Sequence, residues 1–141
     1  MQFMSFSEHV ALTPVPVRLW VLWLTVAMVA APVVLLLWRE TRRTGLAVAA
    51  VNLANAAAMQ ALFAESGFTR LLGLPHLVFW TPLLVLCALR LRRGVAAAPP
   101  RVALAAFAAT LAVSLAFDAV DVARWLLGER APMVAVPGDA G

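Results

Sequence analysis

The stretch that decides the fold is LWVLWLTVAMVAAPVVLLLW, residues 19–38. It carries no charged residue, and as a helix it would be about 30 Å long at a rise of about 1.5 Å per residue. That length matches the hydrocarbon core of a bilayer, so the stretch is typical of a membrane-spanning helix. The apolar core of a secretory signal peptide is shorter. We therefore expect this segment to remain in the protein as its first span, bent at Pro32.

The rest of the chain has the same character, because 64% of its 141 residues are hydrophobic and 13% are charged. Soluble domains are about 45–50% apolar and about 25% charged, so the composition excludes a soluble enzyme domain and a disordered chain. Three further apolar runs predict three more spans, at residues 45–64, 71–89 and 102–127. The third span contains Pro75 and Pro82 and should be irregular or bent. The predicted fold class is all-α, a polytopic membrane protein with a four-transmembrane-helix bundle.

Outside the four spans little sequence remains. The chain divides into a lead-in, a membrane domain and a tail, at residues 1–18, 19–127 and 128–141. The lead-in contains Pro14 and Pro16 and no long apolar run, which predicts an amphipathic or irregular segment. The last span should continue as a helix to Leu127, because Gly128 is a natural helix stop. The tail, from Glu129 on, should be flexible, and the loops between spans should be short.

The basic residues indicate how the bundle is oriented, because all 11 of them are arginine. Seven lie in the connections after the first and third spans: Arg39, Arg42, Arg43, Arg90, Arg92, Arg93 and Arg101. Cytoplasmic loops carry an excess of Arg and Lys, so these connections should be cytoplasmic and both termini extracytoplasmic, N-out/C-out. Tryptophans favour membrane interfaces, and the predicted boundaries agree, with Trp20, Trp23 and Trp125 outside and Trp38 inside. We expect a multi-pass protein of the bacterial inner (plasma) membrane.

Small residues form a ridge along two of the predicted spans. The second span carries Ala47, Ala50, Ala54, Ala57 and Ala61, and the fourth carries Ala105, Ala109, Ala112, Ala116, Ala119 and Ala123. Lipid removes the hydrophobic drive for helix association, so membrane helices associate by close packing through small residues. This pattern predicts that the second and fourth spans pack against each other.

Polar residues lie on the faces opposite these alanines. Asn52 and Asn55 share such a face on the second span, and Ser114 lies on the corresponding face of the fourth. A buried amide without a hydrogen-bond partner costs several kcal/mol in hydrocarbon, so these polar packing residues should face a protein neighbour. That neighbour is either another helix of this chain or another subunit. The pattern is our basis for expecting a homo-oligomer or a larger membrane complex.

Ionisable residues gather at the predicted outer end of the bundle. The candidate polar, ion or partner site consists of Glu65, His76, Asp118, Asp121 and Arg124. A carboxylate costs about 2.5–3.5 kcal/mol at the centre of a membrane helix and usually marks a functional site. Three interpretations remain open: a partner or lipid-headgroup contact, a cation or proton site, and ordinary interfacial capping of the helix ends.

The chain contains no motif of a known catalytic class. It has no phosphate-binding loop, zinc-protease motif or nucleophile elbow, and its one cysteine, Cys87, excludes an intrachain disulfide. Only His76 lies near a span, which argues against a haem held between helices. We therefore predict no catalytic residue, no metal and no cofactor. Arginine placement reflects topology and attraction to anionic membrane lipids, so no nucleic-acid partner is expected.

Two functions follow from these observations. The first is a non-enzymatic accessory, assembly or scaffold component of the membrane that acts through helix–helix contacts. The alternative is a small transporter or ion-conducting protein that uses the carboxylate and histidine cluster of the outer leaflet. Four helices are too few to enclose a pathway, so the alternative requires at least a dimer.

Overall fold

The computed structural model describes residues 5–134, and within that range the chain forms helices and no strand. Four helices are long and apolar enough to cross a membrane, and a short helix precedes them. In chain order the elements are α1 (Phe6–Ala11), α2 (Val15–Leu37), α3 (Arg42–Ser66), the 3-10 helix η1 (Arg70–Gly73), α4 (Leu74–Arg92) and α5 (Ala98–Leu126). The third span begins with η1, which runs directly into α4. The prediction of an all-helical chain with four long apolar helices is confirmed.

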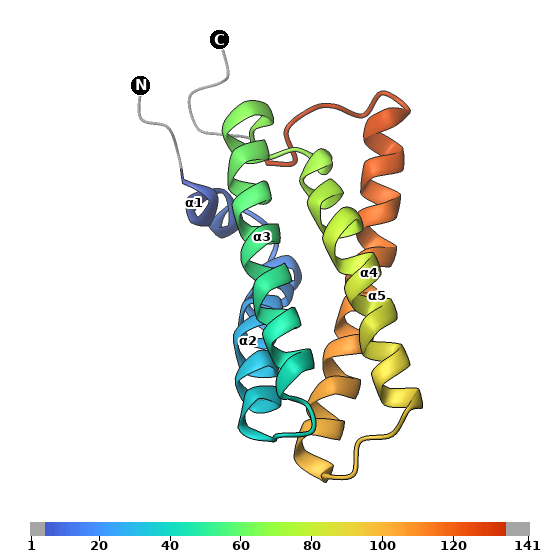
Figure 1. Ribbon diagram of the computed structural model, residues 1–141. Coiled ribbons are helices and arrows are strands. Elements are labelled where there is room, and N and C mark those ends of the chain that lie inside the picture. The colour runs from blue at the N-terminus through green and yellow to red at the C-terminus, as the bar shows by residue number, and fades with distance from the viewer. Residues whose placement is uncertain (1–4, 135–141) are drawn as a thin grey trace.

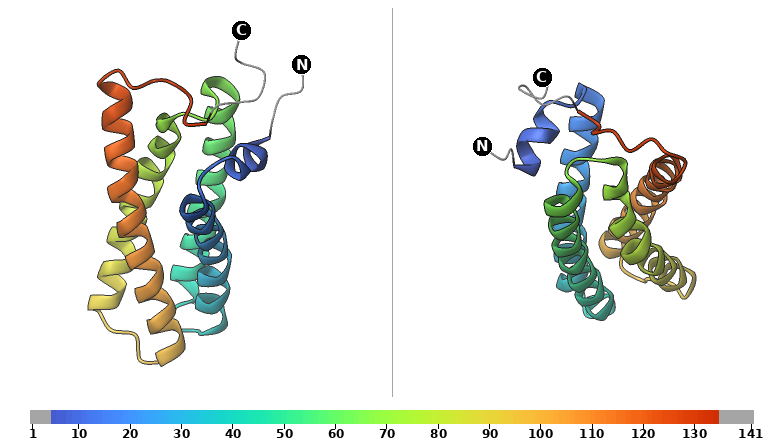
Figure 2. Two further views of the ribbon diagram at one scale, coloured as in Figure 1. Left: turned by 180° about the vertical axis from the view of Figure 1, so that it is seen from behind. Right: turned by 90° about the horizontal axis from the view of Figure 1, so that it is seen from above.

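Helices that follow one another in the chain lie side by side. α2 packs on α3, α3 on α4 and α4 on α5, and α5 closes the ring by packing on α2 (Figure 1). We call the end of the bundle at which α2 begins and α5 finishes the terminal end, because the described chain starts and stops there. The short connections at residues 38–41 and 93–97 lie at the opposite end, which we call the loop end. Seen from above, α2 and α3 form one pair and α4 and α5 another (Figure 2).

The second and fourth spans, α3 and α5, lie diagonally across this ring and are not among the helix pairs that pack together. The prediction that they meet through their alanines is therefore wrong. All six alanines of the α5 ridge are exposed, and on α3 only Ala47 is partly covered. The polar residues turn inward instead, with Asn55 0% and Ser114 2% exposed. Leaving an amide or hydroxyl without a partner in hydrocarbon costs more than exposing a methyl group. In the interior Asn52 donates to the Met28 carbonyl and Ser114 to Asp118, which favours this rotation.

Prolines lie in the first turn of three long helices, α2, α4 and α5, and inside two of the same helices, at Pro32 of α2 and Pro82 of α4. α5 starts at Ala98, so Pro99 and Pro100 belong to its first turn and not to the predicted loop. Proline is tolerated there because the first amides of a helix have no partner within the helix. Pro16 likewise sits in the first turn of α2, which begins four residues before the predicted span.

Glu40 joins the two connections at the loop end. Its carboxylate accepts hydrogen bonds from the backbone amides of Ala96 and Ala97, at 3.1 and 2.8 Å, just before α5 begins. These two bonds hold the pKa of the Glu40 carboxyl below its ordinary value. Arg90 donates to the Glu40 carbonyl oxygen at 2.9 Å. The acid therefore fixes the start of α5 relative to the α2–α3 connection.

Candidate functional site

A cavity of about 660 Å³ opens at the terminal end of the bundle. Most of its wall is apolar, and four aromatic side chains contribute to it. The apolar lining comes from Phe6, Val17, Trp20, Val21, Leu24, Phe68, Leu72, Phe117 and Met133, among others. One region of the wall is polar and contains Arg70, His76, Ser114, Asp118 and Asp121. The cavity therefore combines a hydrophobic body with a localised group of charges.

The inner part of this polar region is a pair formed by His76 and Asp118. Nδ1 of His76 lies 2.9 Å from Oδ2 of Asp118, and the two side chains are only 12% and 16% exposed. The same carboxylate oxygen accepts a hydrogen bond from the Ser114 hydroxyl at 3.3 Å. The His76 ring stacks on Trp80 with 4.0 Å between ring centroids and an interplanar angle of 1°. Both members of the pair are thus fixed in place from more than one side.

Gly73 allows η1 to approach α5 at this point. A Cβ atom on Gly73 would lie 2.9 Å from Oδ1 of Asp118 and 3.1 Å from its Cα atom. Any larger residue would have to displace the α5 backbone. The absence of a side chain at Gly73 therefore helps to set the position of Asp118.

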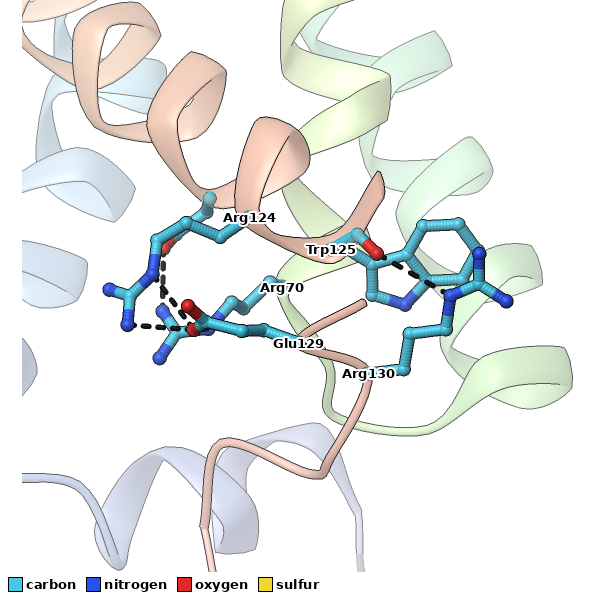
Figure 3. Close-up of polar contacts among 6 residues, drawn as sticks. Arg70, Arg124, Trp125, Glu129 and Arg130 are labelled. Atoms are coloured by element: carbon cyan, nitrogen blue, oxygen red, sulfur yellow. Dashed lines mark hydrogen bonds and ion pairs between the residues drawn. The ribbon is translucent and has the colours of Figure 1, made fainter. Parts of the chain in front are cut away.

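The outer part of the polar region is a chain of ion pairs. Arg70 bonds to Asp121 at 2.7 Å and lies 3.5 Å from Glu129, which in turn bonds to Arg124 at 2.7 Å. Figure 3 shows Arg70 and Arg124 both directed at the Glu129 carboxylate. The hydrogen bond from Arg124, and then the positive charges of Arg124 and Arg70, hold the pKa of Glu129 below its ordinary value. These pairs join η1, the end of α5 and the segment that follows it.

Segments outside the four long helices cover this end. Phe6 of α1 makes ring contacts with Phe63 and Phe68, at 5.8 and 5.6 Å between centroids. The amide of Met133 donates to the Phe68 carbonyl at 2.9 Å, which holds the described part of the tail against the bundle. The rest of the predicted tail, residues 135–141, lies outside the described residues, as do residues 1–4 of the lead-in.

The structure brings together three of the five candidate site residues, His76, Asp118 and Asp121, at one cavity. Arg124 lies beside the cavity and pairs with Glu129. Glu65 is exposed near the end of α3 and does not line the cavity. The candidate group is therefore smaller than the sequence indicated.

The two buried asparagines belong to the interior of the bundle. Nδ2 of Asn52 donates to the Met28 carbonyl at 3.1 Å, which links α3 to α2. Nδ2 of Asn55 has a longer contact, 3.9 Å, to the Met59 sulfur. Oδ1 of each asparagine has no hydrogen-bond partner among the described residues.

Sequence reasoning missed the contribution of Arg70 and the role of Gly73. Arg70 was not among the candidate site residues, although it lies just before the predicted third span, at the same end of the bundle as Asp118 and Asp121. The short helix α1 was also missed, and its signal was present: Ser5 and Glu8 form a capping box, with the Ser5 hydroxyl accepting from the Glu8 amide.

Among residues 5–134, no group of three or more His, Cys, Asp or Glu side chains lies close enough to hold a metal ion. Compared with protein-family models, curated proteins and solved structures, the chain matches none. Its class therefore follows from the fold alone: an all-helical bundle whose four long apolar helices point to a multi-pass membrane protein.

Proposed function

We propose that this chain is a non-enzymatic accessory, assembly or scaffold component of a membrane, and that it acts through helix–helix contacts with other membrane helices. One observation supports this proposal above others. The alanine ridges of α3 and α5 both lie on the outside of the bundle, on opposite corners of the ring. A bundle with two such ridges presents two faces on which another helix can pack at short distance.

In lipid, the drive for helix association differs from that in water. Large apolar side chains gain little there, because lipid tails are as apolar as a partner helix. Alanines allow two backbones to approach closely, so the gain comes from dispersion contacts that lipid tails make less well. The partner is a second copy of the chain or another subunit of a larger membrane complex, with lipids filling the remaining surface.

Enlarging a ridge should disrupt association without disturbing the fold. We expect Ala112→Ile with Ala116→Ile on α5 to weaken association at least tenfold, because the added carbons separate the backbones. The measurement is energy transfer between labelled copies in liposomes, together with mass spectrometry of proteins that co-purify in mild detergent.

The matched control is Val26→Ile with Val29→Ile on α2, at positions that are 51% and 63% exposed. It introduces the same side chain on a face without an alanine ridge and should leave association unchanged. Equal association in wild type, in the ridge variant and in the corresponding α3 variant, Ala54→Ile with Ala57→Ile, would refute the proposal.

We further propose that the protein lies in the bacterial inner membrane with the terminal end outside. Support comes from the arginines around the loop end, since cytoplasmic loops are enriched in arginine. A reporter enzyme that is active only outside the cytoplasm, fused after Gly141, should therefore be active. An inactive fusion, with the same reporter active after a fusion in the 93–97 connection, would reverse the orientation.

A further inference from the structure

The cavity at the terminal end is not needed for helix association through the alanine ridges of α3 and α5. Its volume of about 660 Å³ lies within the range of about 300–1,000 Å³ typical of small-molecule sites. Like such sites, it has a largely apolar wall and a few polar groups gathered in one place. A ligand that fits this division has an apolar chain and one polar head.

The charges of the wall select the sign of that head. Arg70 bonds to Oδ1 of Asp121, and His76 bonds to Oδ2 of Asp118. The second oxygen of each carboxylate has no hydrogen-bond partner among the described residues, and both carboxylates line the cavity. Arg70 is also shared with Glu129, 3.5 Å from its Nε atom, which further reduces the positive charge it offers. A cationic head would be attracted to these two carboxylate oxygens, whereas an anionic head would face them in a partly desolvated site.

The aromatic wall favours the same sign. Phe6, Trp20, Phe68 and Phe117 all line the cavity. The face of an aromatic ring attracts a cation by about 0.5–2 kcal/mol, with more gained as water is excluded. On α2, Val17, Val21 and Leu24 offer an aliphatic surface beside these rings.

We propose that this cavity binds an amphipathic cation, a single alkyl chain that carries a primary or quaternary ammonium group. The ammonium lies at the polar region around Asp118 and Asp121, and the alkyl chain lies along the α2 wall. The inference does not rest on the scaffold function, because the cavity and the alanine ridges are separate surfaces.

Calorimetric titration of the full chain in phosphatidylcholine nanodiscs tests this binding. The probes are decyltrimethylammonium, decanol and decyl sulfate, with empty nanodiscs measured in parallel to subtract partitioning into lipid. We expect saturable binding of one decyltrimethylammonium per chain, at least tenfold tighter than decanol, and no saturable binding of decyl sulfate.

Two variants assign this binding to the cavity. Asp118→Asn removes one of the two carboxylates of the cavity and should weaken binding of decyltrimethylammonium at least fivefold, whereas Glu65→Gln removes a carboxylate outside the cavity and should leave binding unchanged. Val21→Trp fills the apolar wall without altering charge and should abolish saturable binding, so the test holds even where Asp118→Asn fails to fold. Absence of saturable binding, equal binding of decanol, or full binding by a folded Val21→Trp variant would each overturn the proposal.

Discussion

Replacing His76 with leucine is expected to lower the free energy of unfolding by about 2 kcal/mol, within the range for leaving a mostly covered polar group without its hydrogen-bond partner. The loss of stability comes from the Asp118 carboxylate that remains after the substitution. Asp118 would keep only its 3.3 Å hydrogen bond from Ser114, in a position where its side chain is 16% exposed. A carboxylate that loses its main partner in such surroundings keeps the cost of desolvation without the compensating interaction.

The double variant His76→Leu with Asp118→Leu distinguishes this explanation from a simple loss of packing. It removes the isolated carboxylate together with the imidazole, so most of the lost stability should return. Thermal unfolding in detergent, followed by circular dichroism, gives the comparison among wild type, both single variants and the double variant. If the double variant loses as much as the two single variants added together, then the pair is not coupled and the argument fails.

The long helices could be predicted because each depends on a local pattern. Residues 19–38 contain no charge, and α5 continues past Asp118 and Asp121 to Leu126, close to its predicted end at Leu127. Gly128, with φ of 115°, adopts the conformation that made it the expected helix stop. An uncharged run and a helix stop are both recognised from neighbouring residues, without knowledge of the tertiary structure.

The arrangement of the helices was harder to predict, because an amphipathic pattern shows two faces without showing which one turns inward. Alanines and asparagines occupy opposite faces of α3, and either face has a physical reason to be covered. Two features of the chain determine which face of α3 turns inward. Short connections make consecutive antiparallel helices neighbours, which places α3 and α5 on a diagonal. The asparagine face of α3 then turns inward, where Asn52 donates to a backbone carbonyl of α2.

The candidate site, too, was predictable only where it depends on residues close together in the sequence. Asp118 and Asp121 are one turn apart on a single helix, so their common position was predictable. Arg70 reaches Asp121 across 51 residues of sequence, and that contact exists only after η1 packs against α5. Glu65 shares their end of the bundle, but the rotation of α3 leaves it outside the cavity. Helix rotation is a tertiary property, which explains why the sequence grouped Glu65 with the others.

Gly73→Ala is expected to lower the free energy of unfolding by about 2 kcal/mol, in the range for overpacking a close contact. The backbone of Gly73 has φ of −72° and ψ of −16°, a conformation that alanine adopts without strain. The cost must therefore come from contact. The new Cβ atom would lie 3.0 Å from Cβ and 3.1 Å from Cα of Asp118, and a backbone atom cannot move aside as the end of a side chain can.

Two comparisons isolate that contact. Gly128→Ala tests backbone conformation alone, because Gly128 has φ of 115° and no atom within 4 Å of the new Cβ; it should cost about 1 kcal/mol. Adding Asp118→Ala to Gly73→Ala should not restore stability, because the Cβ and Cα atoms at position 118 remain. The measurement is thermal unfolding of wild type, Gly73→Ala, Gly128→Ala and the double variant. Wild-type stability of Gly73→Ala would show that no contact with Asp118 limits the approach of η1. Rescue of Gly73→Ala by Asp118→Ala would show that the carboxylate, and not the α5 backbone, limits it.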